Sequence, residues 1–467
     1  MFGRLPETMG AEKTIAHAAV VRKWEGKAMK RGGRTRIGRG VVVAAALVAA
    51  GLLPISPAQA QGTPAMKLGV VTFLSGPAAG PFGVPSRNAA ELLIKAINAG
   101  TLPAPYNAKG FGGVTVDPIV IDENGSTTKV VQDYRDLVQR RGVNAVIGYV
   151  SSGSCLGVAP VAEELKTLTV FFDCGTPRIF EEANHHYVFR PPATSTMDST
   201  ASARYVLSKY PDTKSIAGIN QNYAWGQDSW SDFDSAMLDL KPGLKVAAAQ
   251  FPKLFAGQYN TEITTLLASD ANIVHSSFWG GDLESFILQA APRGLFQKER
   301  FIMSTGDTVM YRLGAKVPDG IIVGARGPWG VYAHDTELNR WFRKNYIAAY
   351  GTPPIYPSYQ MAISILGMKT AYDKAAAATP KPGVEDVIKA FTHLKYKAFG
   401  TEIDMALGNG HQGEHETAYG ISKYDKATNT PTVTNVVYYP AACVTPPPGV
   451  KSADWIKKGM PGAKDCP

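Results

Sequence analysis

The sequence IGYVSSGSCLGVAPVAEELKTLTVFFDCGT, residues 147–176, decides the fold, because it contains two strand-like segments joined by a helix-like one. Residues 144–150 form a short apolar run, which predicts a buried strand, and residues 168–172 predict the next strand. A helix is expected between them, over about residues 155–166. Two strands joined in this way are typical of a parallel sheet that is covered by helices.

Small residues follow both strands of this segment. Ser151-Ser152-Gly153-Ser154 ends the first strand, and Cys174-Gly175-Thr176 ends the second. Because the carboxyl ends of parallel strands meet at one edge of a sheet, both groups are expected to face one crevice, where ligands bind in open parallel sheets. The hydroxyls of Ser151, Ser152 and Thr176, together with the backbone amides around Gly153, favour a carboxylate there.

The alternation of strand and helix extends on both sides of this segment, from residue 67 to about residue 325. Upstream we predict a strand at 67–73, a helix from Ser86 to Gly100, a strand at 114–121 and a helix at 129–141. A second series begins after Pro191-Pro192, with strands at 215–220, 245–251, 272–278, 300–304 and 320–325. It is followed by helices at 335–350, 358–378 and 384–394 and by a strand pair at 417–424 and 432–439. The two series predict two lobes.

The N-terminal residues carry an export signal. Gly40–Leu53 is apolar but too short to span a bilayer, basic residues between Lys30 and Arg39 precede it, and Ala58-Gln59-Ala60 follows it. We therefore predict a signal peptide that is cleaved after Ala60, with translation starting at Met29. An N-terminal membrane anchor is the alternative.

The excess of positive charge does not indicate a nucleic-acid partner. The chain of 467 residues has a formal net charge of +9. Residues 1–60 hold ten Lys/Arg and three Asp/Glu, so the leader accounts for +7 of this charge and +2 remains on the mature chain. A nucleic-acid partner needs a clustered basic face, and none is visible in the remaining ~407 residues, a length that suits two domains.

Four cysteines lie in the predicted mature chain, an even number in an oxidising compartment. Cys155 lies just beyond one strand end and Cys174 lies at the next, so a bridge between them is geometrically plausible. Cys443 and Cys466 would then link the C-terminal tail. Reduced, buried thiols remain the alternative, because sequence alone does not prove a pairing.

No motif in the chain supports an enzyme or a cofactor. His411, Glu414 and His415 match H-x-x-E-H, a zinc motif that requires a helix. Here the motif sits in the glycine-rich turn 408–413, which predicts a polar surface loop. The glycines at 110–113 do not match the dinucleotide fingerprint, and the chain has neither a phosphate loop nor a Gly-x-Ser-x-Gly elbow. We expect no catalysis, no metal and no cofactor.

Aromatic and acidic residues near the predicted strand ends complete a small-molecule site. The aromatic side chains that we expect at these positions are suited to wall an apolar pocket; they are Phe82, Tyr149, Trp225, Trp279 and Trp329. Asp307 follows the strand at 300–304 and is positioned to accept an ammonium group. Each aromatic alone would be explained by ordinary packing, whereas their coincidence at strand ends favours a pocket.

With these residues the chain resembles the leucine/isoleucine/valine-binding family of type I periplasmic binding proteins, the solute receptors of ABC importers. The markers of the resemblance are Ser75-Gly76-Pro77, Phe82-Gly83, the segment 147–164, Thr176-Pro177, the segment 223–228 and Gly306-Asp307. The resemblance implies an α/β fold of two Rossmann-like lobes, each a parallel sheet flanked by helices. Three crossover strands would join them near 187–192, 321–326 and 414–420. Lobe 1 would comprise 66–190 plus 326–415, and lobe 2 would comprise 191–325 plus 416–467.

The resemblance also implies roles for individual residues. Ser151 or Ser152 and Thr176 would hold a ligand carboxylate, the Cys174 carbonyl and Asp307 would hold an ammonium group, and Phe82, Trp225 and Trp279 would contact the ligand's side chain. The protein is then expected to be a periplasmic monomer that captures a branched-chain or other hydrophobic amino acid by closure of its lobes and delivers it to the membrane subunits of an ABC permease.

Three alternatives stay open at this point. Trp225 and Cys174 depart from the family pattern, which keeps aromatic carboxylates and amides in view as ligands. A sensor domain would share the fold. A secreted zinc hydrolase would rest on the motif at 411–415 alone.

Overall fold

The structure, a computed structural model, describes residues 65–467. The predicted signal peptide and its cleavage after Ala60 lie outside the described residues. None of the helices within 65–467 is long and apolar enough to cross a membrane.

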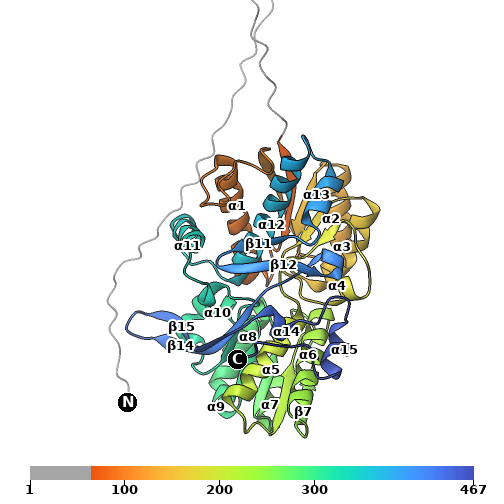
Figure 1. Ribbon diagram of the computed structural model, residues 1–467. Coiled ribbons are helices and arrows are strands. Elements are labelled where there is room, and N and C mark those ends of the chain that lie inside the picture. Colours follow the sequence, from red (N-terminus) through yellow and green to blue (C-terminus); the bar gives the residue numbers. More distant parts are fainter. Residues whose placement is uncertain (1–64) are drawn as a thin grey trace, which may run out of the picture. The chain divides into compact units, whose positions relative to one another are not determined.

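The first lobe, which carries α1, α2, α3 and α12 in the upper part of Figure 1, is built on a parallel sheet of five strands. The strand order is β2-β1-β3-β4-β5. The strands are β1 Met66–Thr72, β2 Val116–Asp122, β3 Ala145–Gly148, β4 Thr169–Phe171 and β5 Val188–Phe189. Each was predicted from its apolar run. β3 pairs with β4 directly, with Ile147 opposite Val170, so the carboxyl ends of these two strands lie side by side, as the segment 147–176 predicted.

Helices cover both faces of this sheet, because side chains alternate between the faces along each strand. Leu68 and Val70 pack with α1 and α12, whereas Val71 packs with α2 and α3. The helices of this lobe are α1 Val84–Ala99, α2 Thr127–Gln139, α3 Ser152–Glu164, α4 Arg178–Glu181, α11 Glu337–Tyr350, α12 Tyr356–Ala378 and α13 Val384–Phe391, with a π-helical turn, η1, at Ala79–Gly83. α1 ends at Gly100, whose φ of 68° is the left-handed conformation that glycine adopts without strain.

The second lobe contains a seven-stranded sheet in the order β15-β14-β10-β9-β8-β6-β7. Its strands are β6 Ser215–Ile219, β7 Lys245–Gln250, β8 Ile273–Ser276, β9 Arg300–Met303, β10 Ile322–Gly324, β14 Thr417–Asp425 and β15 Thr430–Tyr439. Its helices are α5 Ser195–Lys209, α6 Ala224–Leu240, α7 Asn260–Ala268, α8 Gly281–Ala290, α9 Leu295–Lys298, α10 Asp307–Leu313, α14 Ala441–Val444 and α15 Ser452–Lys457.

This sheet is not purely parallel, which differs from the expectation for this lobe. β14 runs antiparallel to both β10 and β15. The reason is the connection between β14 and β15, which spans only residues 426–429. A connection this short joins antiparallel strands, whereas a parallel pair requires a crossover of a dozen or more residues.

A third, three-stranded sheet was not predicted. It consists of β11 Lys395–Ala398, β12 Thr401–Leu407 and β13 Gln412–Glu414. The H-x-x-E-H residues lie in and beside β13, so the prediction of a polar surface loop was wrong. His411 and His415 are buried, and His411 stacks on Phe189 with the ring centres 4.1 Å apart. The Nδ1 atom of His411 contacts the carbonyl of Val188, and that of His415 contacts the carbonyl of Glu416, so their hydrogen bonds are local ones.

Three crossovers join the lobes and lie against one another. The amide of Arg190 donates to the carbonyl of His411, and the amide of Gly413 donates to the carbonyl of Arg190. The third crossover is tied in by Arg326, whose Nη2 donates to the carbonyl of Ala193 at 2.7 Å. The crossovers follow β5, β10 and β13, close to the three predicted segments. The exact residue boundaries of the two lobes stay a prediction.

Both expected disulfides are present. Cys155 in the first turn of α3 is bonded to Cys174 in the loop after β4, and Cys443 in α14 is bonded to Cys466. The first bridge joins the two strand ends that the sequence placed at one crevice.

Candidate ligand-binding site

A small cavity lies between the two lobes, where strands of both sheets end. It has about 210 Å³ of space, part of it open to solvent. Its wall is formed by Phe82, Val150, Ser152, Asp173, Gly175, Tyr223, Trp225, Trp279, Thr305, Arg326 and Tyr356. Typical ligand pockets have roughly 300–1,000 Å³, so the closely packed wall leaves less room here than a typical ligand pocket does.

Aromatic side chains from both lobes occupy five of the eleven positions in the wall. Phe82 in η1 makes edge-to-face contacts with Trp279 and Tyr356, with ring centres 5.1 Å and 5.5 Å apart. Trp279 donates its indole N–H to the Tyr223 hydroxyl at 2.7 Å. Trp225 donates its own to the carbonyl of Ser277 at 2.8 Å. These contacts fix the orientation of each ring, so the cavity has a defined apolar shape.

Gly175 allows Trp225 to reach the cavity. A Cβ atom at position 175 would lie 2.2 Å from the Trp225 ring and 2.6 Å from Nη2 of Arg326. Any other residue there would push the indole and the guanidinium away. Gly175, which the sequence placed at the end of the strand, therefore allows Trp225 of the second lobe to lie close to the backbone of the first lobe.

A buried charge cluster closes one side of the cavity. Arg326, in the crossover after β10, donates to the side chain and the carbonyl of Asp173 and to Oδ2 of Asp198, the last at 3.0 Å. Its guanidinium also lies over the Trp225 ring, 4.5 Å from the centre. The three charged side chains are at most 3 % exposed. Such a cluster binds the two lobes together through one residue of the crossover.

This cluster contains one cation and two carboxylates. Burial raises the pKa of Asp173 to about 7 and that of Asp198 to about 6, although Arg326 opposes both shifts. When both acids are ionised the cluster carries a net charge of −1. Oδ2 of Asp173 is buried and has no hydrogen-bond partner among the protein atoms of residues 65–467. An unpaired carboxylate oxygen in a cavity wall is suited to accept a hydrogen bond from a ligand.

The hydroxyls of Ser152 and Tyr223 in the wall are available as donors. Ser152 Oγ accepts a bond from the amide of Thr176 at 3.3 Å, which leaves its own proton free. The Tyr223 hydroxyl likewise accepts from Trp279 and keeps its proton. Thr305 differs, because it already donates to the carbonyl of Phe278 at 2.6 Å.

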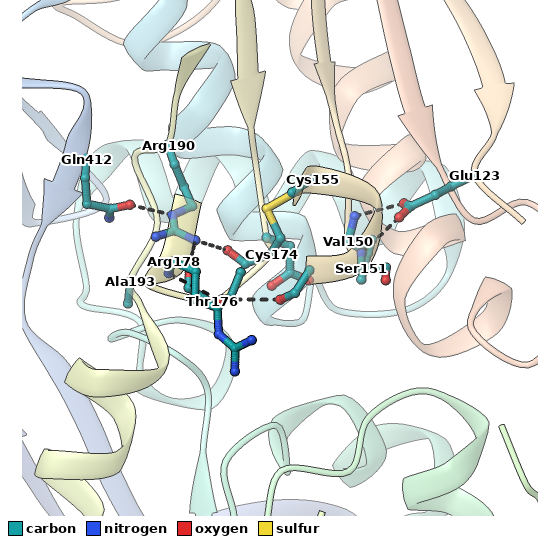
Figure 2. Close-up of a disulfide and its surroundings, with 12 residues drawn as sticks. Glu123, Val150, Ser151, Cys155, Cys174, Thr176, Arg178, Arg190, Ala193 and Gln412 are labelled. Atoms are coloured by element: carbon teal, nitrogen blue, oxygen red, sulfur yellow. Dashed lines mark hydrogen bonds between the residues drawn. A yellow bond between two sulfur atoms is a disulfide. The ribbon is translucent and has the colours of Figure 1, made fainter. Parts of the chain in front are cut away.

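Four of the eight predicted contact residues line the cavity; they are Phe82, Ser152, Trp225 and Trp279. Three of the others bond to protein groups outside the cavity wall; they are Ser151, Cys174 and Thr176. Glu123 accepts the amides of Val150 and Ser151 at 2.8 Å and 2.9 Å, so an acidic side chain of the protein already occupies the amides that lead into α3 (Figure 2). The carbonyl of Cys174 accepts a bond from Arg190 at 2.7 Å, and the Thr176 hydroxyl donates to Asp228 at 2.5 Å.

Asp307 also lies outside the cavity wall. Its carboxylate accepts the amide of Tyr356 at 2.7 Å and the amide of Val331 at 3.1 Å. Burial raises its pKa to about 6, and the two amide bonds oppose this shift. Asp307 therefore positions the start of α12, where Tyr356 contributes a ring to the wall, and does not itself face the ligand space.

Asp173 and Arg326, two polar residues of the cavity wall, were not predicted as contact residues from the sequence. Asp173 is an acidic residue directly after the apolar run 168–172, and such a residue at a buried strand end is a recognisable signal. Arg326 had no such signal, because it meets Asp173 only across 153 residues of sequence. Tyr223, Thr305 and Tyr356 were also missed, since they reach the cavity from three separate parts of the chain.

The comparison with protein families agrees with this geometry. Residues 65–426 match the family model described as periplasmic binding protein. The chain belongs to the periplasmic binding protein family. The match covers both sheets up to β14, and the family implies the periplasm as the location.

Solved structures with the same fold accompany this match, although no curated protein sequence matches the chain. A solute-binding protein from Rhodopseudomonas palustris, in complex with 3,4-dihydroxybenzoic acid, has a TM-score of 0.68 at 18% identity, covering 81% of this chain and 98% of that one. A leucine-binding protein from Thermotoga maritima has 0.66 at 14% identity, over 80% and 98%. An amino-acid transporter's binding protein from Pseudomonas fluorescens has 0.68 at 18%, over 85% and 99%. At these identities the likeness shows the two-lobed fold.

Proposed function

We propose that this protein is the solute receptor of an ABC importer and that it captures a small hydrophobic amino acid between its lobes. The observation that carries the proposal is Oδ2 of Asp173, which has no hydrogen-bond partner among the protein atoms of residues 65–467 and belongs to a residue in the cavity wall. The ligand is then handed to the permease in the membrane. The protein acts as a binding protein and not as an enzyme, and a signal peptide ending at Ala60 delivers it to the periplasm.

The charge of the cavity favours an ammonium group. Arg326 is paired with both Asp173 and Asp198, so a ligand carboxylate finds no unpaired cation in the cluster. A ligand ammonium group near Asp173 would change the net charge of the cluster from −1 to zero. Burying a charge without a partner costs several kcal/mol, so an ammonium near Asp173 lowers the free energy of the closed protein.

The rest of the ligand fits the remaining wall. The hydroxyls of Ser152 and Tyr223 would donate to its carboxylate. Phe82, Trp225 and Trp279 would enclose an apolar side chain. Trp225 and Trp279 come from the second lobe and Phe82 and Ser152 from the first, so the ligand contacts both lobes only when they are closed.

Closure is supported by a contact at the rim of the cavity. Asp228 of α6 accepts bonds from the Thr176 hydroxyl at 2.5 Å and from Nε of Arg178 at 2.9 Å. These residues belong to different lobes. A ligand that contacts both lobes shifts the population toward this closed arrangement, because the open form offers it fewer contacts.

An aromatic carboxylate is the second candidate, and two observations favour it. The wall contains five aromatic rings, and solved structures with this fold were determined with 3,4-dihydroxybenzoic acid, benzoate and 4-hydroxybenzoate. Such a ligand has no ammonium group. It would require Asp173 to be protonated or to remain buried as an unpaired carboxylate.

The experiment that tests the function is identification of the ligand that co-purifies with the exported protein. Native mass spectrometry of the gently purified protein, followed by denaturation and small-molecule analysis, should release a hydrophobic amino acid in near-stoichiometric amount. Re-addition at a hundred times the dissociation constant should stabilise the emptied protein by about 2.7 kcal/mol. Failure of any amino acid or aromatic acid to bind would contradict the receptor function.

A further inference from the structure

A second cavity lies beside the crossovers, separate from the ligand cavity described above. It has about 780 Å³ of space, part of it open to solvent. Arg190 and Gln412 of the crossovers, Phe180 and Glu181 of α4, and the C-terminal segment 446–452 are among its lining residues. We call it the crossover cavity. None of its lining residues contributes to the wall of the ligand cavity.

Arg190 is a fully buried cation in the wall of this cavity. Its Nε donates to Gln412 at 2.5 Å, and its Nη1 donates to the carbonyls of Cys174 and Thr176, each at 2.7 Å (Figure 2). All three partners are neutral. Its Nη2 is buried and has no hydrogen-bond partner among the protein atoms of residues 65–467. Burial lowers the pKa of Arg190 to about 9, which reflects the cost of holding this charge without a bonded counter-ion.

The acidic side chain nearest in the wall is already engaged elsewhere. Glu181 accepts the hydroxyl of Ser452 at 2.5 Å and the amide of Ser452 at 3.1 Å, and no ion pair within 65–467 joins it to Arg190. Lys451 and Asn184 lie on the exposed side of the cavity. The charges that face the cavity are thus Arg190 and Lys451 against Glu181, a net charge of +1.

We propose that the crossover cavity is a second binding site, specific for a small monovalent oxoanion such as a carboxylate. The anion accepts hydrogen bonds from Nη2 of Arg190, which no protein atom satisfies, and neutralises the excess charge of the cavity. Phe180, whose ring centre lies 5.6 Å from the guanidinium, holds Arg190 in place for this contact. The proposal does not depend on which ligand binds in the ligand cavity.

Acetate is the probe that tests this site. Thermal unfolding of the purified protein is followed while sodium acetate replaces sodium chloride at constant ionic strength. The melting temperature should rise along a saturable curve, because acetate binds the folded state alone. A melting temperature that does not change, or that changes without saturation, overturns the proposal.

Asn184→Asp locates the site without disturbing Arg190. Asn184 is exposed and accepts a bond from Asn409 at 3.0 Å through an oxygen that aspartate keeps, so the variant should fold. One added negative charge at the cavity should raise the dissociation constant of acetate at least about tenfold. Asn107→Asp is the matched control, an exposed asparagine that lines neither cavity, and it should leave acetate binding unchanged.

The two variants separate the possible outcomes. Weaker acetate binding in Asn184→Asp alone supports the site. Equal acetate binding in both variants and in the parent protein would mean that acetate binds elsewhere, for example in the ligand cavity. That result overturns the proposal. Arg190→Gln is a supplementary variant, whose loss of acetate binding counts only if it still unfolds cooperatively.

Discussion

Among residues 65–467, Asp173 has the only side-chain carboxylate in the wall of the ligand cavity, and no other atom of these residues bonds to one of its oxygens. Its other oxygen binds Arg326, which holds the side chain in position. The residue thus combines a fixed geometry with an unused acceptor. Asp307, which the sequence placed at the ammonium position, differs because both of its oxygens accept backbone amides.

Asp173→Asn should separate ligands by their charge. The amide keeps the shape and an acceptor for Arg326 but removes the negative charge. A hydrogen bond to a charged group contributes about 1.5–3 kcal/mol, so the affinity for a hydrophobic amino acid should fall by about 10- to 100-fold. Calorimetric titration of leucine and of its amine-free counterpart 4-methylpentanoate measures the effect.

Asp307→Asn is the matched control for this substitution. It also removes a buried carboxylate, but one outside the cavity wall. It should lower the stability of the protein without changing the ratio of the two affinities. If Asp307→Asn changes that ratio and Asp173→Asn does not, the roles assigned to the two residues are reversed.

The pH dependence of binding follows from the raised pKa of Asp173, about 7. The ionised form of Asp173 accepts the ammonium group, and this form is lost as the pH falls through 7. Affinity for an amino acid should therefore be nearly constant between pH 8 and 8.5 and should decline below pH 7, by up to about tenfold per pH unit. Titrations between pH 5.5 and 8.5 measure the profile, and the Asp173→Asn variant should show a flat one. Affinity that rises on acidification would contradict the assignment.

At the scale of elements, the bridge between Cys155 and Cys174 ties the first turn of α3 to the loop after β4. This loop carries Asp173 and Gly175 into the cavity. Replacing both cysteines by serine should lower the free energy of unfolding by about 2–4 kcal/mol, because the unfolded chain regains the freedom of the closed loop. Urea unfolding measures the change. The control is removal of the Cys443–Cys466 bridge. If both removals lower the free energy of unfolding equally and neither lowers the ligand affinity, the first bridge has no special role in the site.

Elements with a single, strong period were predictable from the sequence. The buried strands such as β3 and β4 and the amphipathic helix α1 followed from apolar runs and spacing. The sheet β11–β12–β13 was missed, although residues 401–407 alternate between buried and more exposed positions, because the neighbouring glycines indicated a loop. His411 packs against Phe189, and this tertiary contact buries the segment. A local sequence pattern does not predict such a contact.

The candidate ligand site was predictable in its apolar half and, among the polar residues, at Ser152. Phe82, Trp225 and Trp279 were identified because aromatic residues near strand ends carry a local signal. The polar half depends on the meeting of Asp173, Asp198 and Arg326, which come from three distant parts of the chain. The amides around Gly153 stay a predicted carboxylate site, whereas those of Val150 and Ser151 bond to the side chain of Glu123. Its burial raises its pKa to about 8, although those same amide bonds oppose the shift.

At the scale of the whole described chain, both lobes contribute to one cavity and three crossovers meet beside it. Arg326 belongs to one crossover and Arg190 to another, and each buried guanidinium holds a carbonyl of the loop 173–176. Closure of the lobes and the shape of the ligand space are therefore linked through this loop. The ligand needs to contact both lobes to favour the closed form.

The most direct test of the central claim compares ligands that differ only in the amine. Leucine and 4-methylpentanoate share one carbon skeleton, as do phenylalanine and 3-phenylpropionate. Calorimetric titration of the emptied protein at pH 8 should show that the amine-bearing member of at least one pair binds at least about tenfold more tightly, because only it pairs with Asp173. Equal or tighter binding of the amine-free acids, or of benzoate, would contradict the assignment of an amino acid to this cavity.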